Sequence, residues 1–254
     1  MGLRRLLKNY LYKKKFDITS KKNIGERIER QSILITGANS GIGYELTKKF
    51  LSLNNFVLAT YNKDCENLNK LSNNNLQICQ CDQSKIENVD VIINLIKNKP
   101  INIIINNAGV WGGKNQNFNQ IDYDNFVSAS NINAISILKF AEVVLKYSKR
   151  HSLKSILNIS SQYGSTEHNT SGRDYVYKGT KSMMNSFSKN LSIDLKRDYG
   201  VNVISICPGK VRTKINPGGI LDPQNVALNI IDILDNAETL NGKFINLNKN
   251  ILTW

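Results

Sequence analysis

Residues 32–43 read SILITGANSGIG, and this stretch decides the fold. Its apolar start at 32–36 predicts a buried strand, and residues 43–53 predict the helix that follows. Glycines in the turn between them let the chain bend sharply and let backbone N–H groups approach a pyrophosphate. The positive end of the helix dipole favours an anion at the same place. The stretch therefore predicts a dinucleotide site, with contacts from Thr36, Gly37, Asn39, Ser40, Gly41, Ile42 and Gly43.

Strands and helices alternate along the rest of the chain. The predicted strands lie at 56–60, 76–81, 101–105, 155–159, 201–206 and 243–247, and the predicted helices at 89–97, 123–147, 177–199 and 224–234. This alternation is typical of βαβ units with a parallel sheet. We therefore expect an α/β fold with a Rossmann-like, doubly wound parallel sheet of about seven strands and helices on both faces. We expect these elements to form a single domain over 31–254.

Composition limits the class of protein. Of the 254 residues, 41% are hydrophobic and 21% charged, which is typical of globular chains. No apolar run reaches the roughly 18 residues of a spanning helix, so an integral membrane protein is not expected. The four cysteines and two histidines show no metal-ligand spacing, so we expect no metal, and we expect Cys79 and Cys81 to be buried thiols. This cysteine usage favours a reduced, cytoplasmic location.

Positive charge is concentrated at the start of the chain. The net charge is +14, and residues 1–30 hold ten basic and three acidic side chains, half of that charge. We interpret 1–30 as a basic N-terminal extension. One interpretation is a solvated, partly disordered segment; the other is an amphipathic helix that docks on an anionic membrane or a partner protein, because apolar residues recur at helical spacing at Leu3, Leu6, Leu7, Tyr10 and Leu11. Lysine is common throughout this asparagine-rich, proline-poor chain, so the charge does not predict nucleic-acid binding.

Further motifs resemble those of the short-chain dehydrogenase/reductase superfamily over about 31–254. The glycine spacing G-x-x-x-G-x-G matches, and no Lys-Ser/Thr pair is present, which excludes a nucleoside-triphosphate P-loop. The family's N-N-A-G appears at 106–109, its acidic residue after the third strand at Asp82, and its P-G-x-V-x-T segment at 208–213. The resemblance implies adenine contact from Asp82 and further cofactor contacts from Asn107, Ala108, Gly109, Pro208, Gly209, Val211 and Thr213.

The end of the second predicted strand bears on which dinucleotide binds. NAD-binding proteins of this fold carry an acidic residue there for the ribose 2′-hydroxyl. This chain has Tyr61, Asn62 and Lys63 instead, with no carboxylate before Asp64. A carboxylate would repel a 2′-phosphate, whereas Asn62 and Lys63 tolerate one, although the family's frequent arginine is also missing. We therefore expect NADP, contacted by Tyr61 and Asn62, with NAD as the alternative.

Tyr177 and Lys181 form a Tyr-x-x-x-Lys pair at the start of a predicted helix. This spacing places both side chains on one helix face. We expect the lysine ammonium to lower the pKa of the phenol, which makes the pair a candidate general acid/base. In the family this lysine also binds the nicotinamide ribose, so both residues are expected cofactor contacts. Tyr175 is a weaker candidate because Gly179 stands four residues after it.

The resemblance supplies two more site residues. Ser161 maps to the catalytic serine that holds the substrate oxygen, in preference to Ser160. Asn133 maps to the helix asparagine that anchors a water next to the lysine, in preference to Asn131.

The implied activity is hydride transfer between the nicotinamide of NADP(H) and a carbonyl or secondary alcohol, with Tyr177 as general acid/base. The ending, from Gly242 and Phe244 to Trp254, is similar to that of the C-factor/sniffer-type carbonyl reductases. Only about ten residues, 214–223, stand where relatives place a substrate lid, so we expect an open site. The alternative is a catalytically idle dinucleotide-binding regulatory or interaction protein docked by its basic N-terminus. A homo-oligomer through 123–147 and 177–199 and a monomer both remain open.

Overall fold

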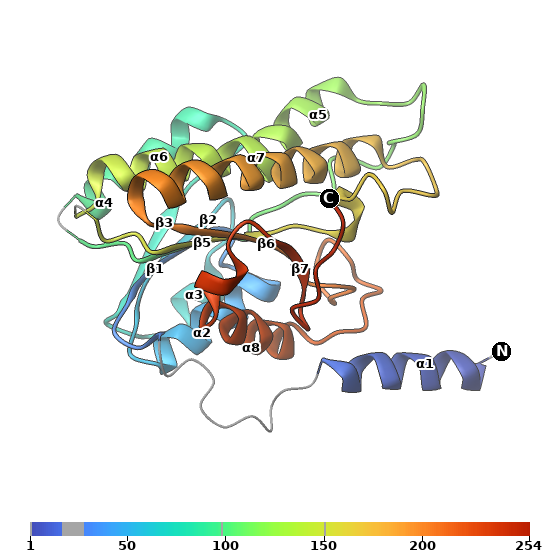
Figure 1. Ribbon diagram of the computed structural model, residues 1–254, viewed down its shortest axis with the longest axis horizontal. Helices are drawn as coiled ribbons and strands as arrows, with labels where there is room; N and C mark the ends of the chain where they lie inside the picture. The colour runs from blue at the N-terminus through green and yellow to red at the C-terminus, as the bar shows by residue number, and fades with distance from the viewer. Residues whose placement is uncertain (1, 17–27, 98, 150) are drawn as a thin grey trace.

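One parallel sheet of seven strands organises the part of the chain that the computed structural model describes, which is residues 2–16, 28–97, 99–149 and 151–254 (Figure 1). The strand order is β3-β2-β1-β4-β5-β6-β7. The strands are β1 (Ser32–Ile35), β2 (Phe56–Tyr61), β3 (Leu76–Gln80), β4 (Ile103–Asn106), β5 (Ser155–Ile159), β6 (Asn202–Cys207) and β7 (Phe244–Asn246). The predicted doubly wound α/β fold is confirmed.

Helices cover both faces of this sheet (Figure 1). On one face lie α2 (Gly41–Ser52), α3 (Glu66–Asn69) and α8 (Pro223–Leu234). On the other lie α4 (Ile93–Ile96), α5 (Tyr123–Ser130), α6 (Ser136–Tyr147) and α7 (Tyr175–Tyr199). Short turns of helix are η2 (Ile86–Ile92), η3 (Asn131–Ile135), η4 (Gln162–Gly164) and η5 (Ala237–Leu240). Coverage of both faces explains why all four residues of β4 are buried.

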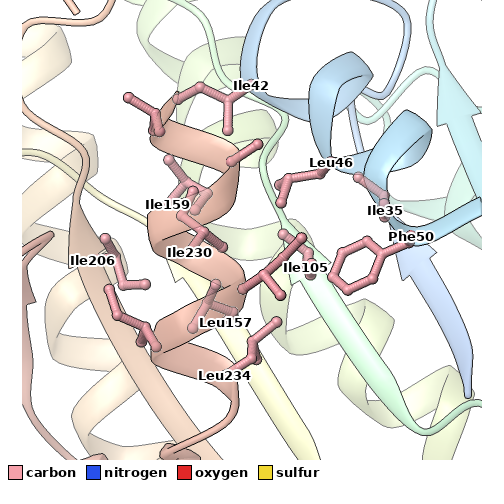
Figure 2. Close-up of a cluster of buried hydrophobic side chains, with 14 of the residues drawn as sticks. Ile35, Ile42, Leu46, Phe50, Ile105, Leu157, Ile159, Ile206, Ile230 and Leu234 are labelled. Carbon is pink, nitrogen blue, oxygen red and sulfur yellow. The ribbon is translucent and has the colours of Figure 1, made fainter. Parts of the chain in front are cut away.

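The core between the sheet and α2 and α8 positions the glycine turn. Figure 2 shows Phe50 of α2 and Ile230 of α8 above the strands, beside Ile105 of β4. These side chains are fully buried, and they belong to one continuous hydrophobic cluster. Because α2 begins at the end of the turn, its packing fixes the direction in which the turn leaves the sheet.

Two predicted helices differ from the observed elements. The helix expected at 89–97 is a 3-10 helix over Ile86–Ile92, followed by a single α-turn at Ile93–Ile96. Its β-branched valines and isoleucines are poor helix formers, and packing takes precedence over the helical pattern. The helix expected at 123–147 is interrupted by a π-helical turn at Asn131–Ile135, a feature that often marks a functional site.

The N-terminal segment contains a helix, α1 (Gly2–Lys15). Phe16, which follows it, is 7% exposed and joins the core cluster under α8. Residues 17–27 of the predicted extension lie outside the described residues. The structure thus contains the helix that the second interpretation of this segment predicts. No helix in the described ranges has the length and apolar character needed to cross a membrane.

Cys79 and Cys81 are free cysteines, buried in the core on the side of the sheet that α6 and α7 cover. The prediction that they are buried thiols is confirmed. Burial raises the pKa of both, and that of Cys81 reaches about 12.

Phe50→Ala tests the packing of α2. Phe50 is 0% exposed, so removing its ring leaves a cavity that lowers the free energy of unfolding by about 3–5 kcal/mol. Val91→Ala is the control, because Val91 is 48% exposed and its loss costs about 0.5 kcal/mol or less. Urea denaturation measures both changes. Equal, small effects would show that Phe50 does not hold α2 to the sheet.

Candidate active site

A cleft of about 830 Å³ opens at the carboxyl ends of the strands. It lies where the strand order reverses direction, between β1 and β4, which is where parallel sheets of this kind bind ligands. Most of the predicted cofactor residues line it, namely Gly37, Asn39, Ser40, Gly41, Ile42, Tyr61, Asn62, Asn107, Ala108, Gly109, Tyr177, Lys181, Pro208, Gly209, Val211 and Thr213. Among the lining residues are three lysines and no carboxylate, a balance that suits a polyanionic ligand.

The glycine turn forms a cradle that side chains would fill. Gly37 has a φ of 62°, and a Cβ there would lie 2.8 Å from the Cα of Ala108. A Cβ on Gly43 would lie 2.5 Å from the amide nitrogen of Asn107 and 2.5 Å from the carbonyl oxygen of Gly37. The turn also leads directly into the N-terminus of α2. These features fit the pyrophosphate of a dinucleotide.

Thr36 and Asn107 hold the turn in place from behind. The Thr36 hydroxyl oxygen accepts hydrogen bonds of 3.0 Å from the backbone N–H groups of Asn107 and Ala108. The Asn107 side chain donates to the carbonyl oxygens of Thr36 and Gly37, at 2.9 and 3.0 Å. Thr36 and Gly43, both predicted as cofactor contacts, are not among the residues that line the cleft; they shape the turn that does.

The far end of the cleft is lined by Tyr61, Asn62 and Gln83. Asp82, predicted to contact adenine, does not line the cleft, whereas its neighbours Cys81 and Gln83 do. Its carboxylate accepts hydrogen bonds from the Asn62 amide at 3.4 Å and from the backbone of Ser84 at 3.0 Å. Asp82 therefore positions Asn62 in this structure.

Tyr177, Lys181 and Ser161 meet at the other end of the cleft. Tyr177 and Lys181 lie one turn apart on α7, with the Lys181 Nζ 5.9 Å from the centre of the Tyr177 ring. The Lys181 ammonium donates to the carbonyl oxygen of Ile159, at 2.8 Å, near the end of β5. Ser161, two residues further on, hydrogen-bonds through its side chain to the Tyr177 hydroxyl.

The electrostatics of this pair correct one expectation. We predicted that the Lys181 ammonium lowers the pKa of Tyr177, yet burial raises that pKa to about 12, despite the hydrogen bond from Ser161. Burial also lowers the pKa of Lys181 to about 8. Desolvation favours the neutral form of each group, and burial is the largest cause of both shifts. At neutral pH the phenol therefore carries its proton.

Asn133 occupies the π-helical turn and is fully buried. Its side chain accepts from the Val110 N–H at 2.8 Å and donates to the Val110 carbonyl and the Thr180 hydroxyl, each at 2.9 Å. It therefore joins the segment after N-N-A-G to α7. Asn133 does not line the cleft itself, but a Cβ on Gly109 would lie between its amide oxygen and the Lys181 ammonium, at 3.4 and 3.7 Å.

The weaker candidates make other contacts. Asn131 donates to the Ser84 carbonyl oxygen at 2.7 Å, away from α7. The Ser160 hydroxyl donates to the Asn185 amide oxygen at 2.7 Å. Tyr175 is 46% exposed and lies against Phe118. The geometry agrees with the preference for Asn133, Ser161 and Tyr177, whose catalytic roles remain predictions.

Two aromatic side chains that the sequence analysis did not single out surround Tyr177. Trp111 stacks on the Tyr177 ring with centroids 4.4 Å apart, and Tyr163 meets that ring edge-on at 6.1 Å. Their positions in sequence, two residues after Gly109 and two after Ser161, could have indicated them. Tyr12 of α1 also lines the cleft, but its distance in sequence gave no signal.

The C-terminal segment contacts both β7 and the loop that follows Ser161. The rings of Phe244 and Trp254 stack with centroids 5.6 Å apart, and the Ser165 hydroxyl donates to the Trp254 carbonyl oxygen at 3.3 Å. The two ends of the predicted Gly-x-Phe…Trp motif are thus in contact, and they hold the loop that follows Ser161.

The chain belongs to the short-chain dehydrogenase family. The profile of that family, described as short chain dehydrogenase, matches residues 31–219. This range includes the glycine turn, the N-N-A-G segment and the Tyr177–Lys181 pair.

Relatives and solved structures agree with this assignment. The chain is 30% identical over 239 residues to the uncharacterized oxidoreductase YDL114W of Saccharomyces cerevisiae, covering 84% of this chain and 74% of that protein. It is 29% identical over 187 residues to the NADP-dependent 3-hydroxy acid dehydrogenase YdfG of Escherichia coli, covering 70% and 72%. The carbonyl reductase Sniffer of D. melanogaster superposes with a TM-score of 0.80 at 26% identity, covering 89% of this chain and 100% of that one.

Gly43→Ala tests the cradle. The added methyl group would overlap the Asn107 amide and the Gly37 carbonyl, so the turn must open, and we expect affinity for NADPH, used as the probe, to fall at least about tenfold. Gly179→Ala is the control, because Gly179 is not among the residues that line the cleft and a Cβ there makes only ordinary contact with the Phe126 ring, at 3.5 Å. Fluorescence titration measures both. Unchanged affinity in Gly43→Ala would show that the turn does not hold the ligand.

Proposed function

We propose that the protein is an NADP(H)-dependent oxidoreductase that reduces a carbonyl group to an alcohol. The observation that carries this proposal is the meeting of Tyr177, Lys181 and Ser161 at one end of a cleft whose other end is a glycine cradle. Family membership and the oxidoreductase relatives support the same reaction class.

Charge in the cleft supports NADP in preference to NAD. Lys181, Lys210 and Lys214 line the cleft without a carboxylate, and the end of β2 presents Tyr61 and Asn62. An acidic residue at that position would bind a ribose 2′-hydroxyl and repel a 2′-phosphate. The NADP dependence of the relative YdfG points in the same direction.

The protein's own residues would bind and protonate the substrate. When bound, the cofactor would supply a hydride to the carbonyl carbon. Tyr177 gives its hydroxyl proton to the carbonyl oxygen, while the Ser161 hydroxyl donates a hydrogen bond to that oxygen and stabilises its developing charge. Lys181, buried beneath the ring, stabilises the phenolate that remains. A phenol whose pKa lies near 12 is protonated at neutral pH, which suits reduction.

The substrate end of the cleft favours a carbonyl compound with an apolar or aromatic portion. Trp111 and Tyr163 provide aromatic surface next to Tyr177. The segment after Thr213 is short, and exposed residues such as Lys214 and Ile215 form the rim. No observation favours the idle binding protein over the enzyme, because a protein that only binds the dinucleotide does not need the Tyr177–Lys181–Ser161 group.

Tyr177→Phe tests the proton donor. Removing the hydroxyl should lower kcat for NADPH-dependent reduction of a panel of aldehydes, ketones and quinones by about 100-fold or more, while NADPH affinity stays close to that of the wild type. Tyr163→Phe removes a hydroxyl from a neighbouring ring and should keep kcat within about tenfold. If Tyr177→Phe turns over at the wild-type rate, another group donates the proton.

The pH profile tests Lys181. Its pKa is lowered to about 8, so the ammonium is present below that pH and lost above it. We expect kcat/KM for reduction to be level near neutral pH and to fall above pH of about 8, by up to tenfold per pH unit. Tyr177, with a pKa near 12, stays protonated over this range. Lys181→Arg keeps its positive charge over this range, so kcat/KM of that variant should not fall above pH of about 8. A wild-type profile that rises through this range would contradict the role of Lys181.

A further inference from the structure

Helix α1 presents an apolar face that none of the residues described by the structure covers. Leu6, Leu7, Tyr10 and Leu11 are 66%, 58%, 60% and 56% exposed. Because an α-helix has about 3.6 residues per turn, the pairs 6 and 10, and 7 and 11, lie one above the other on neighbouring strips of one face. Four large apolar side chains on a single face form a contiguous exposed patch, in contrast to the single apolar residues that are normal on protein surfaces.

The opposite face of α1 is fixed to the domain. Phe16, just after the helix, is 7% exposed, and its carbonyl oxygen accepts a hydrogen bond of 2.7 Å from the Asn229 amide of α8. The Tyr12 ring packs edge-on against Phe16 at 5.1 Å. The Tyr12 hydroxyl hydrogen-bonds to the backbone of Lys210 and lies 2.8 Å from the position of a Cβ on Gly209. These contacts hold α1 with its leucine face turned outward.

Positive charge borders the leucine face. Helical spacing places Lys8 and Lys15 along the edge next to Leu11, and Lys13 along the edge next to Leu6. Lys14 stands at the C-terminal end of the leucine face itself, one turn after Tyr10. All are exposed, and residues 2–16 contain no aspartate or glutamate. The neighbouring loop adds the exposed side chains of Lys210, Arg212 and Lys214, and Arg212 lines a small cavity together with Lys13. Arg212 is paired with Asp222 at 3.5 Å, so the lysines contribute most of this charge.

We propose that α1 docks this protein on the surface of membranes that contain anionic phospholipids. An apolar helix face bordered by lysines binds in the plane of the bilayer interface, with leucines among the acyl chains and ammonium groups at the phosphates. At 14 residues the helix is about 21 Å long, too short to span the hydrocarbon layer. Pairing of α1 with α1 of a second copy would bring together two helices whose charged residues are all basic. Repulsion between these charges disfavours self-association.

Docking brings the cleft close to the lipid. Tyr12 lines the cleft from the inner face of the helix whose outer face carries the leucines. The cleft wall would therefore lie about one helix diameter, 10–12 Å, from the lipid surface. The proposal itself does not depend on the identity of the substrate or of the cofactor.

Co-sedimentation of the full chain with vesicles tests the proposal. We expect binding to phosphatidylcholine vesicles that contain roughly one-third phosphatidylserine, and much weaker binding to phosphatidylcholine alone. Raising salt from about 0.1 M to about 1 M shortens the Debye length from about 10 Å to about 3 Å and should weaken binding. Leu7→Glu should lower the apparent affinity at least about tenfold. Ile193→Glu is the control, because Ile193 is 54% exposed on α7, and it should bind as the wild type does.

A second pair of substitutions keeps the test independent of folding. Lys8→Gln with Lys15→Gln leaves the apolar face intact, and it should weaken binding by about fivefold per lysine and reduce its dependence on salt. No sedimentation with either vesicle, equal binding to both, or equal losses in Leu7→Glu and Ile193→Glu would overturn the proposal. A wild-type dimer that Leu7→Glu converts to a monomer, without vesicle binding, would assign the face to a second copy instead.

Discussion

The close approach of the Gly37 turn to Ala108 is the constraint on which the site depends. A side chain at Gly37 would place its Cβ 2.8 Å from the Ala108 Cα, and the Thr36 hydroxyl binds both backbone N–H groups on the other side of the contact. The contact joins the ends of β1 and β4, where the sheet order reverses. A cleft forms there because the chain leaves the two strands toward opposite faces of the sheet.

The same contact extends to the reacting end of the cleft. Val110, two residues beyond Ala108, is held through both backbone polar groups by Asn133. Asn133 also donates to the Thr180 hydroxyl, and that hydroxyl in turn donates to the carbonyl oxygen of Tyr177. A continuous series of hydrogen bonds therefore runs from the segment that follows N-N-A-G to the helix that carries the tyrosine. Burial along this path explains why the Tyr177 phenol keeps its proton and why the pKa of Lys181 falls.

The sequence predicted most of what local patterns can encode. The strands are short apolar runs followed by polar residues or glycine, so the order of elements and the residues at the strand ends followed from the chain itself. The sign of the Tyr177 pKa shift did not, because it depends on how deeply the side chain is buried rather than on spacing. The π-helical turn around Asn133 was also missed, because its side chain is satisfied by Val110 and Thr180, which are distant in sequence. Tyr12 reaches the cleft only through the fold of the whole chain.

The most direct measurement uses the two tryptophans of the chain. Trp111 stacks on Tyr177 inside the cleft, whereas Trp254 stacks on Phe244 outside it. If a nicotinamide ring binds against Tyr177, excitation of tryptophan must produce emission from bound NADPH, Trp111→Phe must remove most of that emission, and Trp254→Phe must leave most of it. If energy transfer from tryptophan to NADPH is unchanged in Trp111→Phe, the nicotinamide ring binds elsewhere. An absence of NADPH binding would contradict the assignment of this cleft.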